Sequence, residues 1–103
     1  MYKLTVFIPD THLEIVKNAL FDAGAGQIGN YSHCSWQVLG QGQFMPLEGN
    51  QAFIGTTDKL ETVAEWRVEM VVVQQKINDV ITALKHAHPY ETPAYDVIKF
   101  EKF

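Results

Sequence analysis

Apolar and polar residues alternate along four stretches of the chain, a pattern that is typical of β-strands with one buried face. The stretches are residues 2–8 (YKLTVFI), 30–38 (NYSHCSWQV), 61–73 (ETVAEWRVEMVVV) and 90–100 (YETPAYDVIKF). The third is the clearest, because apolar residues occupy every second position over most of its length. We therefore predict four strands, with a further short strand near residues 43–45.

Two stretches instead repeat their apolar residues with the helical spacing i, i+3, i+4. The first follows the pattern Thr11-x-x-Glu14, which predicts a capping box, and Gly24 stands where a C-terminal cap belongs. The second covers residues 74–87 and ends there, because His88 precedes a proline and is pushed out of helical geometry. The apolar stripes are Val16, Ala19, Leu20 and Ala23 in the first helix and Ile77, Val80, Ile81 and Leu84 in the second.

The predicted order of strand, helix, strand, strand, helix, strand is the βαββαβ pattern of the ferredoxin-like fold. We expect one α+β domain over residues 1–103, with both helices on one face of an antiparallel sheet. The other face has no cover within the chain; depending on strand register, it carries residues such as Phe7, Val71 and Val97. Because such a face is either solvated or buried by another subunit, we favour a homo-oligomer. Residues 40–60, rich in Gly, Pro, Asn and Thr taken together, predict a long hairpin connection with a functional or oligomer-contact role.

Residues 24–29, GAGQIG, match the G-x-G-x-x-G pattern of a dinucleotide-binding turn. In that motif a strand precedes the glycines, and the phosphate lies at the start of the helix that follows. Here a predicted helix precedes the glycines and a predicted strand follows them. We therefore interpret the segment as a helix-to-strand turn whose glycines adopt left-handed conformations.

Composition narrows the classes of function. The 103 residues are 47% apolar and 19% charged, which is typical of a globular protein. The formal net charge of -4, without any cluster of Lys and Arg, argues against nucleic acid or an anionic membrane as partner. The start of the chain lacks a signal-peptide pattern, and no apolar run reaches the length of a membrane span, so we expect a cytoplasmic protein. The single cysteine excludes an internal disulfide.

The segment 86–96 brings imidazole and carboxylate groups close together around a proline-fixed turn. Such groups are the usual protein ligands of zinc, copper and nickel. One interpretation is a divalent-metal site made by His86, His88 and Glu91. The other is a rigid turn that ends the helix, in which Tyr90 is packed and Glu91 accepts backbone hydrogen bonds.

Cys34 is the candidate nucleophile of the chain. Its neighbour His33 would point to the opposite face of a strand, so it is not placed to act as a base. We expect Cys34 to be a small core residue, and Trp36 and Trp66 to be core residues as well. The alternatives are a nucleophilic Cys34 in an enzyme, and His33 or Cys34 as additional metal ligands. We assign no catalytic residue.

Three motifs in order resemble the YqfO-type domain, which is inserted in some members of the NIF-three-like (NIF3-like) family, often called GTP cyclohydrolase I type 2 homologues. They are GAGQIGNYSHCSWQVLGQGQFMP at 24–46, E-x-x-x-E-W-R-x-E at 61–69 and AHPYETPAYDV at 87–97. The resemblance covers about residues 1–101, and the chain is similar to free-standing forms of that domain. It implies a role in regulation or assembly. The dinuclear metal site of the larger proteins is built by their flanking domains and is not carried over.

The HPYE segment followed by a proline also resembles the end of CutA proteins, the divalent-cation-tolerance family, which share the ferredoxin-like fold with PII signalling proteins and form trimers. The resemblances together imply an oligomeric binding or regulatory module, a trimer or a dimer, rather than an enzyme. The sequence does not identify its ligand, and a divalent metal ion is the cofactor considered. The implied ligand-binding residues are Gly26, Tyr31, Cys34, Tyr90 and Glu91.

Overall fold

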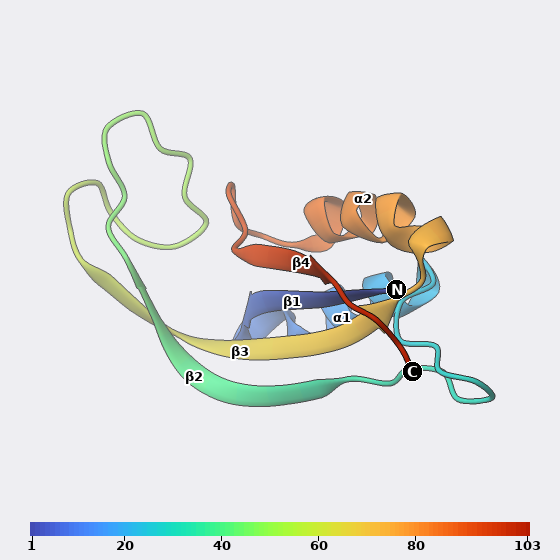
Figure 1. Cartoon of the computed structure of the whole chain (residues 1–103). Helices are drawn as coiled ribbons and strands as arrows, with labels where there is room; N and C mark the ends of the chain where they lie inside the picture. Colours follow the sequence, from blue (N-terminus) through green and yellow to red (C-terminus); the bar gives the residue numbers. More distant parts are fainter.

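The computed structural model describes residues 1–103 and contains two α-helices and a four-stranded antiparallel sheet (Figure 1). The strand order is β2-β3-β1-β4, and a 3-10 turn leads into each helix. The predicted α+β class and βαββαβ order are confirmed. The elements are β1 (Tyr2–Pro9), α1 (Leu13–Asp22), β2 (Trp36–Phe44), β3 (Glu61–Val72), α2 (Ile77–Ala87) and β4 (Tyr95–Lys99).

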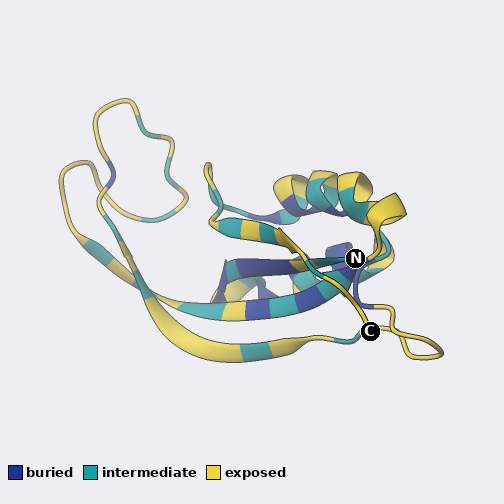
Figure 2. Ribbon diagram, in the orientation of Figure 1, coloured by how far each residue is buried: buried dark blue, intermediate teal, exposed yellow.

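The core lies between the helices and one face of the sheet. Alternate residues of β1 and of the second half of β3 point toward the helices, as a period of two requires. Val16 and Leu20 of α1 and Val80 and Leu84 of α2 belong to the same cluster and have no exposed surface. Figure 2 shows dark, buried residues along β1, in contrast to the largely exposed β2. The strand residues of this core are Leu4, Val6, Ile8, Val68, Met70 and Val72.

The start of α1 differs from the prediction, while its end agrees with it. A 3-10 turn at Asp10–His12 moves the first α-helical residue to Leu13, and no side chain caps the helix. The Oγ1 atom of Thr11 hydrogen-bonds to Nδ1 of His12 at 2.9 Å instead of to a backbone amide. The predicted capping box is therefore wrong. Gly24 follows the helix with a φ of 114°, as expected for a glycine that ends it.

The segment 24–29 forms a helix-to-strand turn, and all three of its glycines have positive φ. Gly26 is the most constrained of them. Its N–H donates to the carbonyl of Val71 at 2.8 Å, and its carbonyl accepts from the N–H of Cys34 at 2.8 Å. A Cβ at this position would lie 2.8 Å from the ring of Phe21. The turn leads toward β2, without the helix start that a phosphate site requires.

β2 and β3 form a long hairpin that projects from the rest of the molecule (Figure 1). β2 begins at Trp36 rather than near residue 30, and it continues through Phe44, so that it includes the short strand predicted near 43–45. Glycines in the middle of β2 interrupt the apolar alternation, which is why its length was not apparent. We call residues 39–64, the distal part of this hairpin, the arm. The arm gives the molecule a long axis of 46 Å, against 24 and 23 Å in the other directions.

The sheet face away from the helices is called the open face. Cross-strand partners point to the same side, so the pairing of Trp36 with Glu69 and of Ile98 with Lys3 places all four on this face. Trp36 is 59% exposed and Ile98 is 58% exposed. The core position predicted for Trp36 is therefore wrong, whereas Trp66 packs against the core as expected. The open face also carries Phe7, Val38, Arg67 and Val71.

Val97 does not lie on the open face, where it was predicted. It pairs with Leu4 and packs against the core from the side of the helices. The reason is register: Tyr95 pairs with the buried Val6, so the odd-numbered residues of β4 face inward. A strand shifted by one residue would exchange the two faces.

Charged groups also meet on the open face. The carboxylate of Glu69 accepts hydrogen bonds from Nζ of Lys3 at 2.9 Å and from a guanidinium nitrogen of Arg67 at 2.6 Å. The hydrogen bond from Lys3 is the largest influence that lowers the pKa of Glu69. The face thus combines exposed apolar side chains with charges of both signs.

Neither helix of the molecule has the length and apolar character needed to cross a bilayer.

Candidate ligand-binding site

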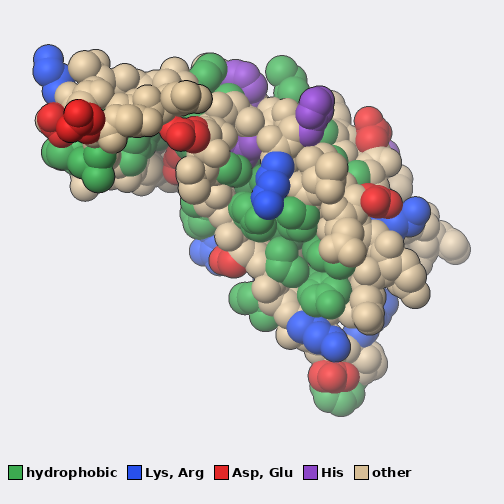
Figure 3. Space-filling view, turned by 90° about the horizontal axis from the view of Figure 1, so that it is seen from above, with side chains coloured by type: hydrophobic (Ala, Val, Ile, Leu, Met, Phe, Trp, Pro, Cys, Tyr) green, Lys and Arg blue, Asp and Glu red, His purple; other side chains and the backbone are tan.

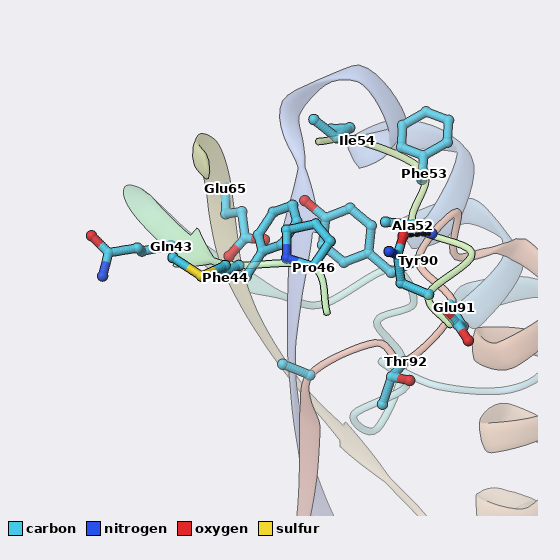
Figure 4. Close-up of a pocket in the computed structure, with 13 residues that line it drawn as sticks. Gln43, Phe44, Pro46, Ala52, Phe53, Ile54, Glu65, Tyr90, Glu91 and Thr92 are labelled. Atoms are coloured by element: carbon cyan, nitrogen blue, oxygen red, sulfur yellow. Dashed lines mark hydrogen bonds between the residues drawn. The ribbon is translucent and has the colours of Figure 1, made fainter. Parts of the chain in front are cut away.

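A pocket lies where the arm meets the turn that follows α2 (Figure 4). Its volume of about 380 Å³ is at the lower end of the range for small-molecule sites. Three separate segments form it: the end of β2 with the loop behind it, one residue of β3, and the turn 90–94. The lining residues are Gln43, Phe44, Met45, Pro46, Asn50, Ala52, Phe53, Ile54, Glu65, Tyr90, Glu91, Thr92 and Ala94.

His88 fixes the turn on one side of the pocket. The α-helix ends at Ala87, as predicted, and His88 adopts an extended conformation with φ -71° and ψ 134°. Its ring is buried, with Nε2 2.7 Å from the carbonyl of Phe7 and Nδ1 accepting the N–H of Tyr90 at 3.1 Å. This pair of contacts fits the neutral tautomer with the proton on Nε2. Burial lowers the pKa of His88, which the contact with the Phe7 carbonyl partly opposes, so the neutral form is favoured.

Tyr90, held by that contact, places its ring in the pocket wall. Its ring centroid lies 6.2 Å from that of Phe44 and 6.5 Å from that of Phe53. The phenol oxygen is buried, and the carboxylate of Glu65 lies close to it. Burial raises the pKa of Tyr90, and the nearby carboxylate of Glu65 raises it further, so the phenol stays protonated. Figure 4 shows aromatic rings from the arm and from the turn gathered in one place.

Glu91 links the turn to the arm. Its Oε1 accepts the backbone N–H of Gln51 at 2.8 Å. The loop around this contact is ordered by Asn50, whose side-chain amide donates to the carbonyl of Leu47 at 2.7 Å and to Oγ1 of Thr57 at 2.8 Å. These polar contacts hold the far wall of the pocket in place, in a loop with little buried apolar surface.

The implied ligand-binding residues fall into two groups. Tyr90 and Glu91 line the pocket together. Gly26 and Cys34 are joined by a backbone hydrogen bond in the glycine turn, and Tyr31, 75% exposed, lies in the same segment. Figure 1 shows this turn at the opposite end of the sheet from the arm. The structure therefore does not bring the five residues into one site.

Cys34 lies before the first residue of β2 and is half-buried, so it is not a residue of the core cluster. The expected core position is wrong because β2 starts later than predicted. His33 has a φ of 60°, and its ring contacts Oγ of Ser32 and the ring of Phe21. Nothing in these contacts activates the thiol of Cys34.

The three predicted metal ligands are engaged separately. His88 uses both ring nitrogens in hydrogen bonds, and Glu91 accepts the amide of Gln51. His86 is exposed in the last turn of α2. No three His, Cys, Asp or Glu side chains of the chain converge as a metal would require. These contacts fit the interpretation of a rigid turn at the end of α2 better than a metal site made by all three residues.

Sequence reasoning did not identify Phe44, Phe53 and Glu65 as site residues. They lie far from Tyr90 in the chain, and only the fold of the hairpin brings the segments together. The aromatic residues within a glycine-rich loop were the available signal, since loops that carry large apolar side chains often bind a ligand or a partner.

Comparison with known proteins gives strong matches over nearly the whole chain. It is 48% identical over 97 residues to a GTP cyclohydrolase 1 type 2 homologue from Halalkalibacterium halodurans and 47% identical over 95 residues to one from Mycobacterium leprae. These matches cover 94% and 92% of this chain but only 26% and 25% of the relatives. The chain thus spans about a quarter of their length. No protein-family model matches it.

Solved structures give the same result. A Bacillus cereus protein related to NIF3 superposes with a TM-score of 0.83 and 46% identity, covering 98% of this chain and 26% of that one. The periplasmic divalent cation tolerance protein CutA from Archaeoglobus fulgidus has a TM-score of 0.69 at 20% identity, and the match covers 100% of this chain and 87% of that one. The PII-like protein CutA from Nostoc superposes with a TM-score of 0.68 at 18% identity, and the match covers 98% of this chain and 82% of that one. The chain is homologous to about a quarter of the length of proteins called GTP cyclohydrolase 1 type 2 homologues and of a protein related to NIF3, and it shares the fold of CutA and PII-like proteins.

Proposed function

We propose that this domain is an oligomeric binding module, which associates with further copies of itself through the open face and holds a small ligand in the pocket beside Tyr90. The observation that carries the binding role is the pocket itself. It is preformed, and it is walled by side chains from the arm and the turn after α2. We do not extend the cyclohydrolase activity in the relatives' name to this chain, because it spans only about a quarter of their length.

The open face supports self-association. Trp36, Val38 and Ile98 are 59%, 43% and 58% exposed, and large apolar side chains grouped on one face favour burial by a partner. Lys3 and Arg67 beside Glu69 give the same face charges of both signs, so a second copy offers complementary charges. A copy of the chain is therefore the partner that fits best.

The divalent-metal alternative has weaker support. It was predicted from His86, His88 and Glu91, but the two ring nitrogens of His88 are already hydrogen-bonded. We therefore give the metal no part in the proposed binding role.

The assembly is tested by sedimentation velocity over a wide range of protein concentration. We expect wild type to sediment as an oligomer and the double variant Trp36→Lys, Val38→Glu to sediment as a monomer. The new charges would stand opposite Glu69 and Arg67 respectively, so cross-strand attraction protects the monomer fold. Ile15→Lys, at a residue of α1 that is 60% exposed and off the open face, is the control. A monomeric wild type at high concentration, or an unchanged oligomer in the double variant, would contradict the assembly.

The binding role is tested by a thermal-shift screen of small molecules of all charge classes. A ligand of the pocket should raise the melting temperature of wild type and have a smaller effect on Tyr90→Ala, since only ligand bound to the folded state stabilises it. If no compound of any class binds near Tyr90, the binding role is refuted.

A further inference from the structure

The pocket has an unusual balance of charge. Two carboxylates, those of Glu65 and Glu91, are among its lining residues, and no Lys, Arg or His is. Neither carboxylate forms a salt bridge within the chain; the ion pairs involve Glu14 and Glu69 only. Glu65 is also half-buried. In a partly desolvated pocket an unpaired negative charge favours a positively charged occupant.

The remaining wall is aromatic and aliphatic. Phe44, Phe53 and Tyr90 contribute rings from the arm and from the turn after α2, and Pro46 and Ile54 add apolar surface. In Figure 4 Glu65 lies on one side of these rings and Glu91 on the other. Aromatic faces attract cations through their quadrupole, and groups of them are the usual way in which proteins recognise organic ammonium ions.

Three ligand classes fit this wall less well. An anion would face Glu65 and Glu91 without any counter-charge from the lining residues. A hard metal ion needs several oxygen ligands around one point, and no cluster of three acidic or imidazole side chains exists. A neutral apolar molecule would cover the carboxylate of Glu65 without compensating its charge.

We propose that the ligand of this pocket is a small organic ammonium ion, whose charge is held by Glu65 and whose alkyl groups contact the rings of Phe53 and Tyr90. This inference rests on the proposed binding role and specifies its ligand class. The volume of about 380 Å³ limits the ligand to a small molecule. Figure 3 shows the arm reaching out from the body, with acidic side chains on it and near its base and a basic side chain at its tip, and the acidic groups near the base favour the approach of a cation.

The test is titration of the wild-type protein with choline, tetramethylammonium and butylammonium, followed by calorimetry and by NMR shifts of the Gln51 and Glu91 amides. The neutral isostere of choline, 3,3-dimethylbutan-1-ol, the anion 3-methylbutyrate, and Mg²⁺ and Zn²⁺ alone are the comparison ligands. We expect at least one ammonium ion to bind and the neutral isostere to bind about 10- to 100-fold more weakly, as loss of a charge-assisted contact requires.

Two variants with matched controls locate the site. Glu65→Gln should weaken ammonium binding by about 10- to 100-fold, whereas Glu48→Gln, the same change at an exposed arm residue outside the pocket wall, should not. Phe53→Leu keeps the site apolar but removes a ring, and it should weaken binding by about 3- to 30-fold. Phe103→Leu is its control. Circular dichroism and the melting temperature of each variant report whether it is folded.

The outcomes separate this inference from the proposed function. If the neutral isostere, the carboxylate or a metal ion binds in the pocket at least as well as the ammonium ions, the ligand class is wrong but the binding role stands. The ligand class also fails if ammonium ions bind and Glu65→Gln binds them equally. If no probe of any class shifts the Gln51 and Glu91 amides, this inference fails, and the wider screen described above decides the binding role.

Discussion

The arm and the helix-covered body of the molecule share one sheet but are held together in different ways. In the body, the core residues of both helices and of the central strands have almost no exposed surface. In the arm, Pro46 is the one buried residue. Five of its large apolar side chains are about half exposed or more, namely Leu39, Met45, Leu47, Phe53 and Leu60.

Polar contacts provide the order that apolar burial does not provide in the arm. Asn50 bonds to both sides of its loop, and Glu91 reaches from the body to the amide of Gln51. Such contacts contribute about 1 kcal/mol each, less than a buried leucine does. The difference indicates that the arm can change in sequence and position without unfolding the domain, which suits a region that binds a ligand.

The largest expected effect on the free energy of unfolding distinguishes a leucine of the body from a leucine of the arm. Leu20→Ala removes a side chain with no exposed surface and should lower the free energy of unfolding by about 2–5 kcal/mol. Leu47→Ala, in the arm and 65% exposed, should change it by less than about 0.5 kcal/mol. Urea denaturation measures both. Equal losses would mean that the arm is as integral to the fold as the core.

A smaller effect concerns the junction between body and arm. Burial lowers the pKa of His88 in the folded protein, so the unfolded chain binds this proton more readily. The contribution of His88 to the free energy of unfolding is therefore fully present above the pKa of the unfolded chain, about 6.5. As the pH falls below that value, the free energy of unfolding decreases by at most about 1.4 kcal/mol per pH unit. The nearby Glu65 opposes the shift in pKa and His12 adds to it.

Urea denaturation between pH 7.5 and 5 measures this dependence. His88→Gln should flatten the curve below pH 6.5, whatever its effect on stability at neutral pH. His86→Gln, which changes the neighbouring exposed histidine, is the matched control. An identical slope in wild type and both variants would show that His88 titrates alike in the folded and unfolded states.

The smallest effect on stability is expected from the hydrogen bond between the Glu91 carboxylate and the Gln51 amide, which joins the body to the arm. Glu91→Gln weakens the contact with the amide of Gln51 and should lower the free energy of unfolding by about 1 kcal/mol or less. Local opening should be affected more, and hydrogen exchange of the Gln51 amide should become faster while the amides of β1 keep their protection. Glu101→Gln is the matched control. Unchanged exchange at Gln51 would show that the arm is ordered without this link.

The two regions were also unequally predictable. The period of two in β1 and β3 and the helical stripes around Leu20 and Leu84 reveal which faces are buried, because burial imposes its period on the sequence. The arm carries no such period: glycines interrupt β2, and its loop is ordered by side-chain hydrogen bonds. Trp36 and Val97 were placed on the wrong faces, since strand register depends on the partner strand.

For the candidate site, Tyr90 and Glu91 were identified from their own segment, because a turn fixed by prolines and rich in polar groups is visible locally. Glu65, Phe44 and Phe53 were not, because they come from the hairpin and approach Tyr90 only when the chain is folded. The motif around His88 suggested a metal ligand, and the folded structure instead shows both ring nitrogens of this buried histidine in hydrogen bonds.

From its own pattern, then, the chain determined its class, the order of its helices and strands, and the core residues of its helices and of β1 and β3. These follow from local geometry and from the need to remove apolar side chains from water. Each segment meets that need by repeating its apolar residues with the period of a strand or of a helix. Tertiary structure alone decided the strand register, which side chains of β2 and β4 lie on the open face, and the assembly of the pocket. These depend on distances between segments that are remote in the chain, and no local period encodes such distances.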